Sequence, residues 1–271
     1  NLSVPPTDEK NPYTEAFWRW WPRLSKSLLE LRVTGGEPLL SSDLWRLLEQ
    51  FRKGENSGIR LAINSNLGVK REIMDRLITY AQDIPQLEIY TSNEAFGPHA
   101  EYIRDGLNYS TWRENILRLR ETTPIQRIHV MMTVNALCLY SMTDLFDDIL
   151  RWRQKHDRLI GIWSLNLLRF PSFMNVLVLP DYIKRERRQN LQQWLKHNSQ
   201  NELLHESEKA ALQRLIDYLA LVTHPHAKAD RQEQNWKDFK SFYTQYDSRR
   251  GKDFYATFPA EITDWYRGIN V

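Results

Sequence analysis

Apolar, β-rich runs alternate with helix-period segments along the chain as far as Leu165. The runs expected to form strands are Leu28–Val33, Ile59–Ile63, Leu87–Thr91, Arg127–Val134 and Leu159–Leu165. The segments expected to form helices are part of Tyr13–Leu29, then Leu44–Phe51, Lys70–Ala81, Thr111–Arg120 and Asp144–Lys155. Because parallel neighbours need a crossover connection, this alternation predicts βα units and a parallel sheet.

The pattern changes after Pro180, where helical periods continue and no clear strand follows. Helices are expected over Tyr182–Lys196, Glu206–Leu221 and Gln232–Tyr246. We therefore divide the chain into a polar, Pro-containing linker (1–12), an α/β core (13–180) and a helical C-terminal extension (181–271) that covers one side or the bottom of the sheet. The predicted core is a partial (β/α) barrel with one unit missing. Since the chain begins at Asn1 rather than Met, we expect a missing N-terminal part to supply that unit.

Composition excludes several classes of function. With 41% hydrophobic and 26% charged residues, the chain can bury a core and keep a solvated surface, and no apolar stretch approaches the roughly 20 residues of a membrane span. The net charge is only +3, and the basic clusters Lys184–Arg188 and Arg249–Arg250 fit solvated helix faces, so nucleic acid is not implied. The only cysteine, Cys138, excludes an internal disulfide and fits a reducing, cytoplasmic compartment.

The tetrapeptide Gly35-Gly36-Glu37-Pro38 directly follows the first expected strand. Two glycines let the backbone turn sharply and approach a ligand closely, and Pro38 stiffens the exit from the turn. Glu37 adds a carboxylate, and a helix signal begins at Ser41. This βα junction is suited to hold a small cationic group.

Polar residues also follow each of the other expected strands. In barrels of βα units the ligand site forms where the carboxyl ends of the strands meet. The candidate residues beyond the first turn are Asn64, Ser65, Asn66, Ser92, Asn93, Glu94, Thr133, Asn135, Asn166 and Arg169. Any one of them alone fits a helix cap or a loop. Their convergence on one rim favours a binding site.

The segment LRVTGGEPLL resembles the region around the GGEP motif of radical S-adenosylmethionine (SAM) enzymes. Ser92-Asn93-Glu94-Ala95, followed by Arg104, is similar to the S-x-D-G…R region of that superfamily, with Glu94 where Asp is usual and Ala95 where Gly is usual. Asn64-Ser65-Asn66 resembles the third-strand segment, and Thr133-Val134-Asn135 resembles the strand near the nucleoside.

The resemblance implies a SAM site. The turn and Glu37 would face the ammonium of SAM, Ser92 and Arg104 its carboxylate, and Asn135 and Asn166 the ribose and adenine. The full predicted set of cofactor-binding residues is Gly35, Gly36, Glu37, Pro38, Asn64, Asn66, Ser92, Glu94, Arg104, Thr133, Asn135, Asn166 and Arg169.

Two later segments are similar to twitch domain-containing radical SAM proteins: Asn166–Pro171, running on to Leu179-Pro180 and Lys184, and Tyr246–Gly251 with Phe258-Pro259. That resemblance implies a C-x3-C-x2-C motif upstream of Asn1 for a [4Fe-4S] cluster, and an auxiliary iron–sulfur cluster. It also implies an electron donor such as flavodoxin or ferredoxin. The reaction would be reductive cleavage of SAM to a radical that abstracts hydrogen from an unidentified substrate, a peptide or a small metabolite. Because Cys138 alone cannot supply three thiolates, the chain as given is expected to be inactive.

Two other interpretations stay open at this point. One is a cluster-free relative that binds a nucleotide or a peptide as a scaffold. The other is an aldolase- or isomerase-type barrel with Glu37 as general base, which needs a lysine or an acid on the same rim. For His99, the pair His224 and His226, the clustered tryptophans from Trp18 to Trp21 and the thiol of Cys138, loop or packing roles are expected, and no metal site is predicted.

Overall fold

A parallel sheet of five strands forms the centre of the molecule in the computed structural model, which describes residues 11–54, 56, 58–125, 127–156, 160–221 and 229–270. The strands lie side by side in chain order, and every neighbouring pair is parallel. They are β1 (Glu30–Val33), β2 (Arg60–Ser65), β3 (Leu87–Ser92), β4 (Arg127–Val134) and β5 (Ile160–Leu167). The predicted α/β class and parallel sheet are thus confirmed. Leu159, expected to begin the last strand, lies outside the described residues.

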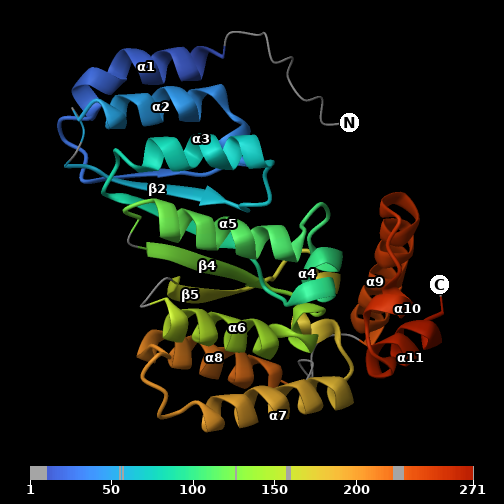
Figure 1. The fold of residues 1–271 in the computed structure, drawn as a ribbon. Helices are drawn as coiled ribbons and strands as arrows, with labels where there is room; N and C mark the ends of the chain where they lie inside the picture. The colour runs from blue at the N-terminus through green and yellow to red at the C-terminus, as the bar shows by residue number, and fades with distance from the viewer. Residues whose placement is uncertain are drawn as a thin grey trace.

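Helices connect successive strands, as the βα alternation predicts. Those of the core are α1 (Pro12–Leu24), α2 (Ser42–Arg52), α3 (Arg71–Ala81), α4 (Gly97–Ile103), α5 (Tyr109–Thr122) and α6 (Met142–Lys155). Short 3-10 helices follow several strands: η1 (Pro38–Leu40), η2 (Cys138–Tyr140), η3 (Ser172–Met174) and η4 (Val176–Val178). The C-terminal helices are α7 (Asp181–His197), α8 (Glu206–Leu219), α9 (Ala229–Arg250), α10 (Phe254–Thr257) and α11 (Ala260–Gly268). Figure 1 shows the core helices running alongside the strands.

The two faces of the sheet differ in polarity because side chains alternate along a strand. In β3, Leu87 and Ile89 are buried against the helices, whereas Glu88 and Tyr90 point to the other face and are only partly buried. The same alternation in β2 leaves Asn64 on the second face. The sheet therefore has one apolar, helix-covered face and one polar face.

A buried ion pair joins the sheet to α8. Arg153 of α6 and Glu208 of α8 have side chains only 2% and 0% exposed, and they meet at 2.6 Å. Arg153 also donates to the carbonyl of Leu203 at 2.7 Å. Glu208 accepts from the backbone N–H of Trp163 in β5 at 2.8 Å. The ion pair therefore links α6 to α8, and the bond to Trp163 links α8 to β5. Both buried charges have hydrogen-bond partners, as buried ion pairs require.

The C-terminal helices separate into two groups. Helices α7 and α8 pack together beside β5, whereas α9, α10 and α11 gather near α4 (Figure 1). Helix α9 contacts η3, which follows the carboxyl end of β5, and Tyr246 of α9 donates to the carbonyl of Tyr102 in α4 at 2.7 Å. Helices α7 and α8 thus cover one side of the sheet, as expected for the C-terminal extension. Helices α9 to α11 instead lie at the carboxyl ends of the strands.

Strand β1 pairs with β2 alone among the described residues, so its other edge carries no strand there. This open edge fits a partial barrel. Residues 1–10 of the expected linker, and both His224 and His226, lie outside the described residues. None of the helices described combines the length and the apolar character that crossing a bilayer requires.

Candidate functional site

The turn after β1 presents open backbone to the carboxyl end of the sheet. Gly35 has a φ of +154°, which L side chains rarely adopt, and a Cβ added at Gly35 or Gly36 would meet no heavy atom within 4 Å. Thr34, Gly35 and Gly36 are exposed. They line a cavity of about 650 Å³ together with α1 and the start of α2. The glycines therefore leave open space in front of the turn.

The carboxylate of Glu37 accepts hydrogen bonds from residues of the protein itself. Its Oε1 accepts hydrogen bonds from the N–H of Leu39 at 3.2 Å and from the hydroxyl of Ser65 at 2.8 Å, and its Oε2 accepts from the N–H of Asn66 at 2.9 Å. Glu37 thus ties the β1 turn to the end of β2. Because a carboxylate has about four acceptor positions, little capacity remains for the ammonium of a ligand. The structure gives Glu37 a structural role that the motif did not predict.

Arg104 and Glu94 form an ion pair at the two ends of the segment that contains α4. The Nε of Arg104 donates to Oε2 of Glu94 at 2.7 Å, and the side chains are 27% and 6% exposed. Burial raises the pKa of Glu94, with Arg104 acting in the opposite direction. Glu94, predicted to contact cofactor, holds Arg104 through this ion pair. The two terminal nitrogens of Arg104 form no hydrogen bond with any described residue, so they can donate two parallel hydrogen bonds to an anion.

The other predicted residues divide between the open rim and the interior. Thr133 and Asn166 are adjacent in the β4–β5 register and exposed, while Ser92 is half-buried at the end of β3. Asn135 is 8% exposed, and its Oδ1 accepts from the N–H groups of Leu137 and Cys138 at the turn before η2. This local role of the Asn135 oxygen was not predicted from the sequence.

Three further predicted residues remain near the rim. Asn66 is exposed, and its Oδ1 accepts from the N–H of Gly68 at 2.8 Å in a local turn. Asn64 lies on the polar face, where its Oδ1 is buried without a hydrogen-bond partner in the described part of the chain. Arg169 is exposed after β5. Among the predicted residues, Thr133 and Asn166 are neighbours in the sheet and Glu94 pairs with Arg104, whereas the cavity at the glycine turn is lined by none of Ser92, Arg104, Thr133 and Asn166.

A row of stacked side chains on the polar face was not predicted. The guanidinium of Arg32 lies 4.2 Å from the ring centre of Tyr90, and Tyr90 stacks on His129 at 4.6 Å. Gly161 makes room for the His129 ring, because a Cβ there would lie 2.7 Å from His129 Cε1. Burial lowers the pKa of His129, and its Nδ1 accepts from the N–H of Ile162. Polar residues at alternate positions of the strands were the signal that could have revealed this row.

Cys138 and His99 have packing roles, as expected. Cys138 is fully buried, its thiol lies 3.0 Å from the carbonyl of Asn135, and burial raises its pKa. His99 stacks on Phe258 at 4.9 Å, and its Nε2 lies 3.0 Å from the carbonyl of Thr257. No group of three or more His, Cys, Asp or Glu side chains suitable for a metal ion occurs among the described residues. The donors that an iron–sulfur cluster requires are therefore not found in this part of the chain.

Comparison with known proteins adds one match. Searches of curated proteins and of solved structures gave no significant match. A family model described as Radical SAM superfamily matches residues 23–149. The matched segment contains β1 to β4, the glycine turn and the Glu94–Arg104 pair. The segment that contains most of the predicted site residues thus matches the Radical SAM superfamily.

Proposed function

We propose that this chain is the SAM-binding core of a radical SAM enzyme. The observation that carries the proposal is the placement of the open Gly35–Gly36 turn and the guanidinium of Arg104 in loops at the carboxyl end of one parallel sheet. The match of residues 23–149 to the Radical SAM superfamily supports the same general kind of enzyme.

The charges of the site fit the methionyl end of SAM. The exposed turn offers carbonyl oxygens to an ammonium group, and the terminal nitrogens of Arg104 suit a carboxylate. The carboxylate of Glu94 accepts from the Nε of Arg104 and so fixes the guanidinium, whose two terminal nitrogens remain for the ligand. Ser92, Thr133 and Asn166 then provide polar contacts along the rim. Glu37 contributes by fixing the turn rather than by direct contact.

The residues of this sequence cannot bind a [4Fe-4S] cluster, which needs three cysteine thiolates. The only cysteine of the sequence, Cys138, is buried and bonded to the backbone, so the proposal requires thiolates from outside the 271 residues. In a radical SAM enzyme such a cluster supplies the electron that cleaves SAM to a hydrogen-abstracting radical. By itself, this chain should bind SAM without cleaving it. The twitch relationship, an auxiliary cluster, a flavodoxin- or ferredoxin-type donor and a cytoplasmic location remain parts of this proposal.

The test measures SAM binding to the chain and to Arg104 variants by calorimetry. A hydrogen bond to a charged group contributes about 1.5–3 kcal/mol, so Arg104→Ala should weaken binding roughly 10- to 150-fold. Arg104→Lys should recover little, because an ammonium cannot form two parallel bonds to a carboxylate. The control is Arg214→Ala, an exposed position on α8 outside the site. Equal SAM affinity of Arg104→Ala and the parent would contradict the assignment.

A second ligand separates the enzyme core from a nucleotide-binding scaffold. 5′-Methylthioadenosine carries the nucleoside of SAM but lacks its ammonium and carboxylate. The proposal predicts that it binds much more weakly than SAM and that Arg104→Ala leaves its affinity unchanged. Equal binding of the two ligands would favour the scaffold. A general-base role for Glu37 is disfavoured because its carboxylate already accepts three hydrogen bonds.

A further inference from the structure

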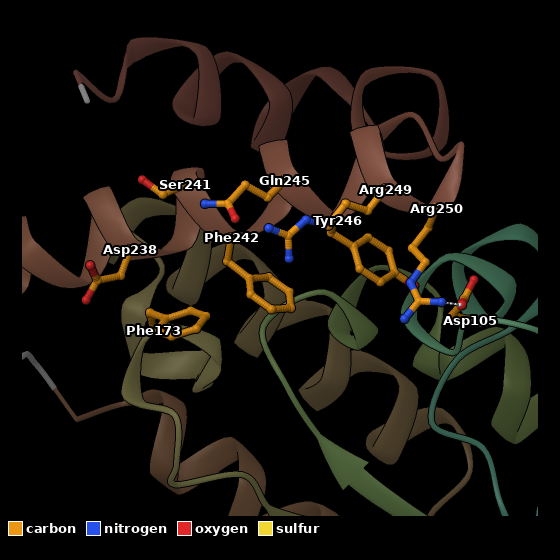
Figure 2. A pocket seen from close by; sticks show the side chains of 9 residues that line it. All are labelled: Asp105, Phe173, Asp238, Ser241, Phe242, Gln245, Tyr246, Arg249 and Arg250. Atoms are coloured by element: carbon orange, nitrogen blue, oxygen red, sulfur yellow. Dashed lines mark ion pairs between the residues drawn. The ribbon is translucent and has the colours of Figure 1, made fainter. Parts of the chain in front are cut away.

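A second cavity lies between α9 and the loops at the carboxyl end of the sheet. Its volume is about 510 Å³, within the range of small-molecule sites. One face of α9 lines it, and Phe173 of η3 and Asp105, directly after Arg104, complete the wall. Figure 2 shows these side chains gathered along α9. The cavity therefore adjoins the loop that carries the proposed carboxylate contact of SAM.

The residues of α9 that line the cavity lie along one face of the helix. Asp238, Phe242, Gln245 and Arg249 follow one another at intervals of three or four residues and thus share one side of the helix. Phe239, one residue after Asp238 and so about 100° around the helix from it, is fully buried against α10 and α11. Helix α9 is therefore docked by the side next to the one that lines the cavity.

Three aromatic rings form an apolar wall. The ring centres of Phe173 and Phe242 are 5.5 Å apart, and Phe242 and Tyr246 stack with their centres 6.0 Å apart. All three side chains are only partly buried. Rings arranged in this way offer flat surface and edges to a further planar group.

Of the charged groups that line the cavity, Arg249 and Asp238 have no ion-pair partner among the described residues. Arg250 is paired with Asp105 at 3.0 Å (Figure 2), and Asp238 accepts from the side chain of Gln234 at 2.8 Å. Arg249 is exposed and forms no ion pair or hydrogen bond with any described residue. In Figure 2 its guanidinium lies among the lining side chains, between Gln245 and Tyr246.

We infer that this cavity binds an aromatic carboxylate, with its ring against Phe173, Phe242 and Tyr246 and its carboxylate on Arg249. A planar guanidinium suits a carboxylate because it forms two parallel hydrogen bonds. The inference rests on the proposed function, since a ligand held here beside Asp105 would be the substrate presented to SAM at the neighbouring Arg104.

The test uses two probes that differ only at the anionic group. N-Acetyl-L-tyrosine carries the carboxylate, and N-acetyl-L-tyrosinamide replaces it with a neutral amide. Calorimetry on the chain should show the acid binding at least about tenfold more tightly than the amide, as expected for one charged contact. Arg249→Gln should abolish this preference, and Arg249→Lys should retain part of it. Arg214→Gln, a matched exposed arginine on α8, should behave as the parent.

Equal affinity for the two probes, no binding of either, or an unchanged preference in Arg249→Gln would overturn the inference. The result is distinguishable from failure of the proposed function because SAM binding is measured separately. If SAM binds and the tyrosine probes fail, only the cavity assignment is wrong. If the probes bind as expected and SAM does not, the cavity assignment stands and the SAM proposal is wrong.

Discussion

Removing the Glu37 carboxylate tests whether it is a structural link between the β1 turn and β2. In Glu37→Ala, the N–H groups of Leu39 and Asn66 and the hydroxyl of Ser65 lose their acceptor. Ser65 is 3% exposed, so water replaces that bond poorly. A hydrogen bond to a charged group contributes about 1.5–3 kcal/mol when buried, and Glu37 is only half-buried, so we take about 1 kcal/mol for each. The free energy of unfolding should fall by about 3 kcal/mol.

Glu37→Gln provides a graded comparison. Its amide oxygen can still accept from Leu39 and Ser65, but its NH₂ group faces the N–H of Asn66, so about 1–1.5 kcal/mol should be lost. Urea unfolding followed by circular dichroism measures both changes. With an m-value of about 2–3 kcal/mol/M, Glu37→Ala should lower the midpoint by about 1 M. Glu114→Gln, an exposed position within α5, is the control. A Glu37→Ala midpoint equal to that of the parent would refute the structural role.

Three further changes test other parts of the molecule. Gly161→Ala should destabilise the protein by about 1–3 kcal/mol in urea unfolding, because its Cβ would lie 2.7 Å from the His129 ring, which Tyr90 blocks on the other side; wild-type stability would show that the ring can move. Glu208→Ala should cost about 3–5 kcal/mol because it leaves Arg153 buried and unpaired, and a loss below about 1 kcal/mol would contradict the buried pair. Burial lowers the pKa of His99 below the ordinary 6.5, so the folded protein favours the neutral ring, and stability should fall as the pH drops below that value. His99→Phe should reduce this fall between about pH 7 and about pH 5, and an unchanged pH profile would show that other groups cause it.

The number and direction of the strands followed from the sequence because they depend on local properties. Apolar runs and helical periods lie within short windows, and short connections restrict how neighbouring units pack. The glycine turn was predictable for the same reason, since glycine can adopt the unusual φ of Gly35 without the steric cost of an L side chain. All five expected strands are present, with ends shifted by a few residues.

Only the tertiary structure decided what the polar groups of the rim do. Glu37 and Glu94 look alike in sequence as strand-end carboxylates, yet one bonds to the end of β2 and the other to Arg104, ten residues further along the chain. Such choices depend on which donors folding brings within about 3 Å, and no local window contains that information. The position of α9 over the strand ends has the same cause, because its contacts with η3 and with Tyr102 join segments far apart in the chain.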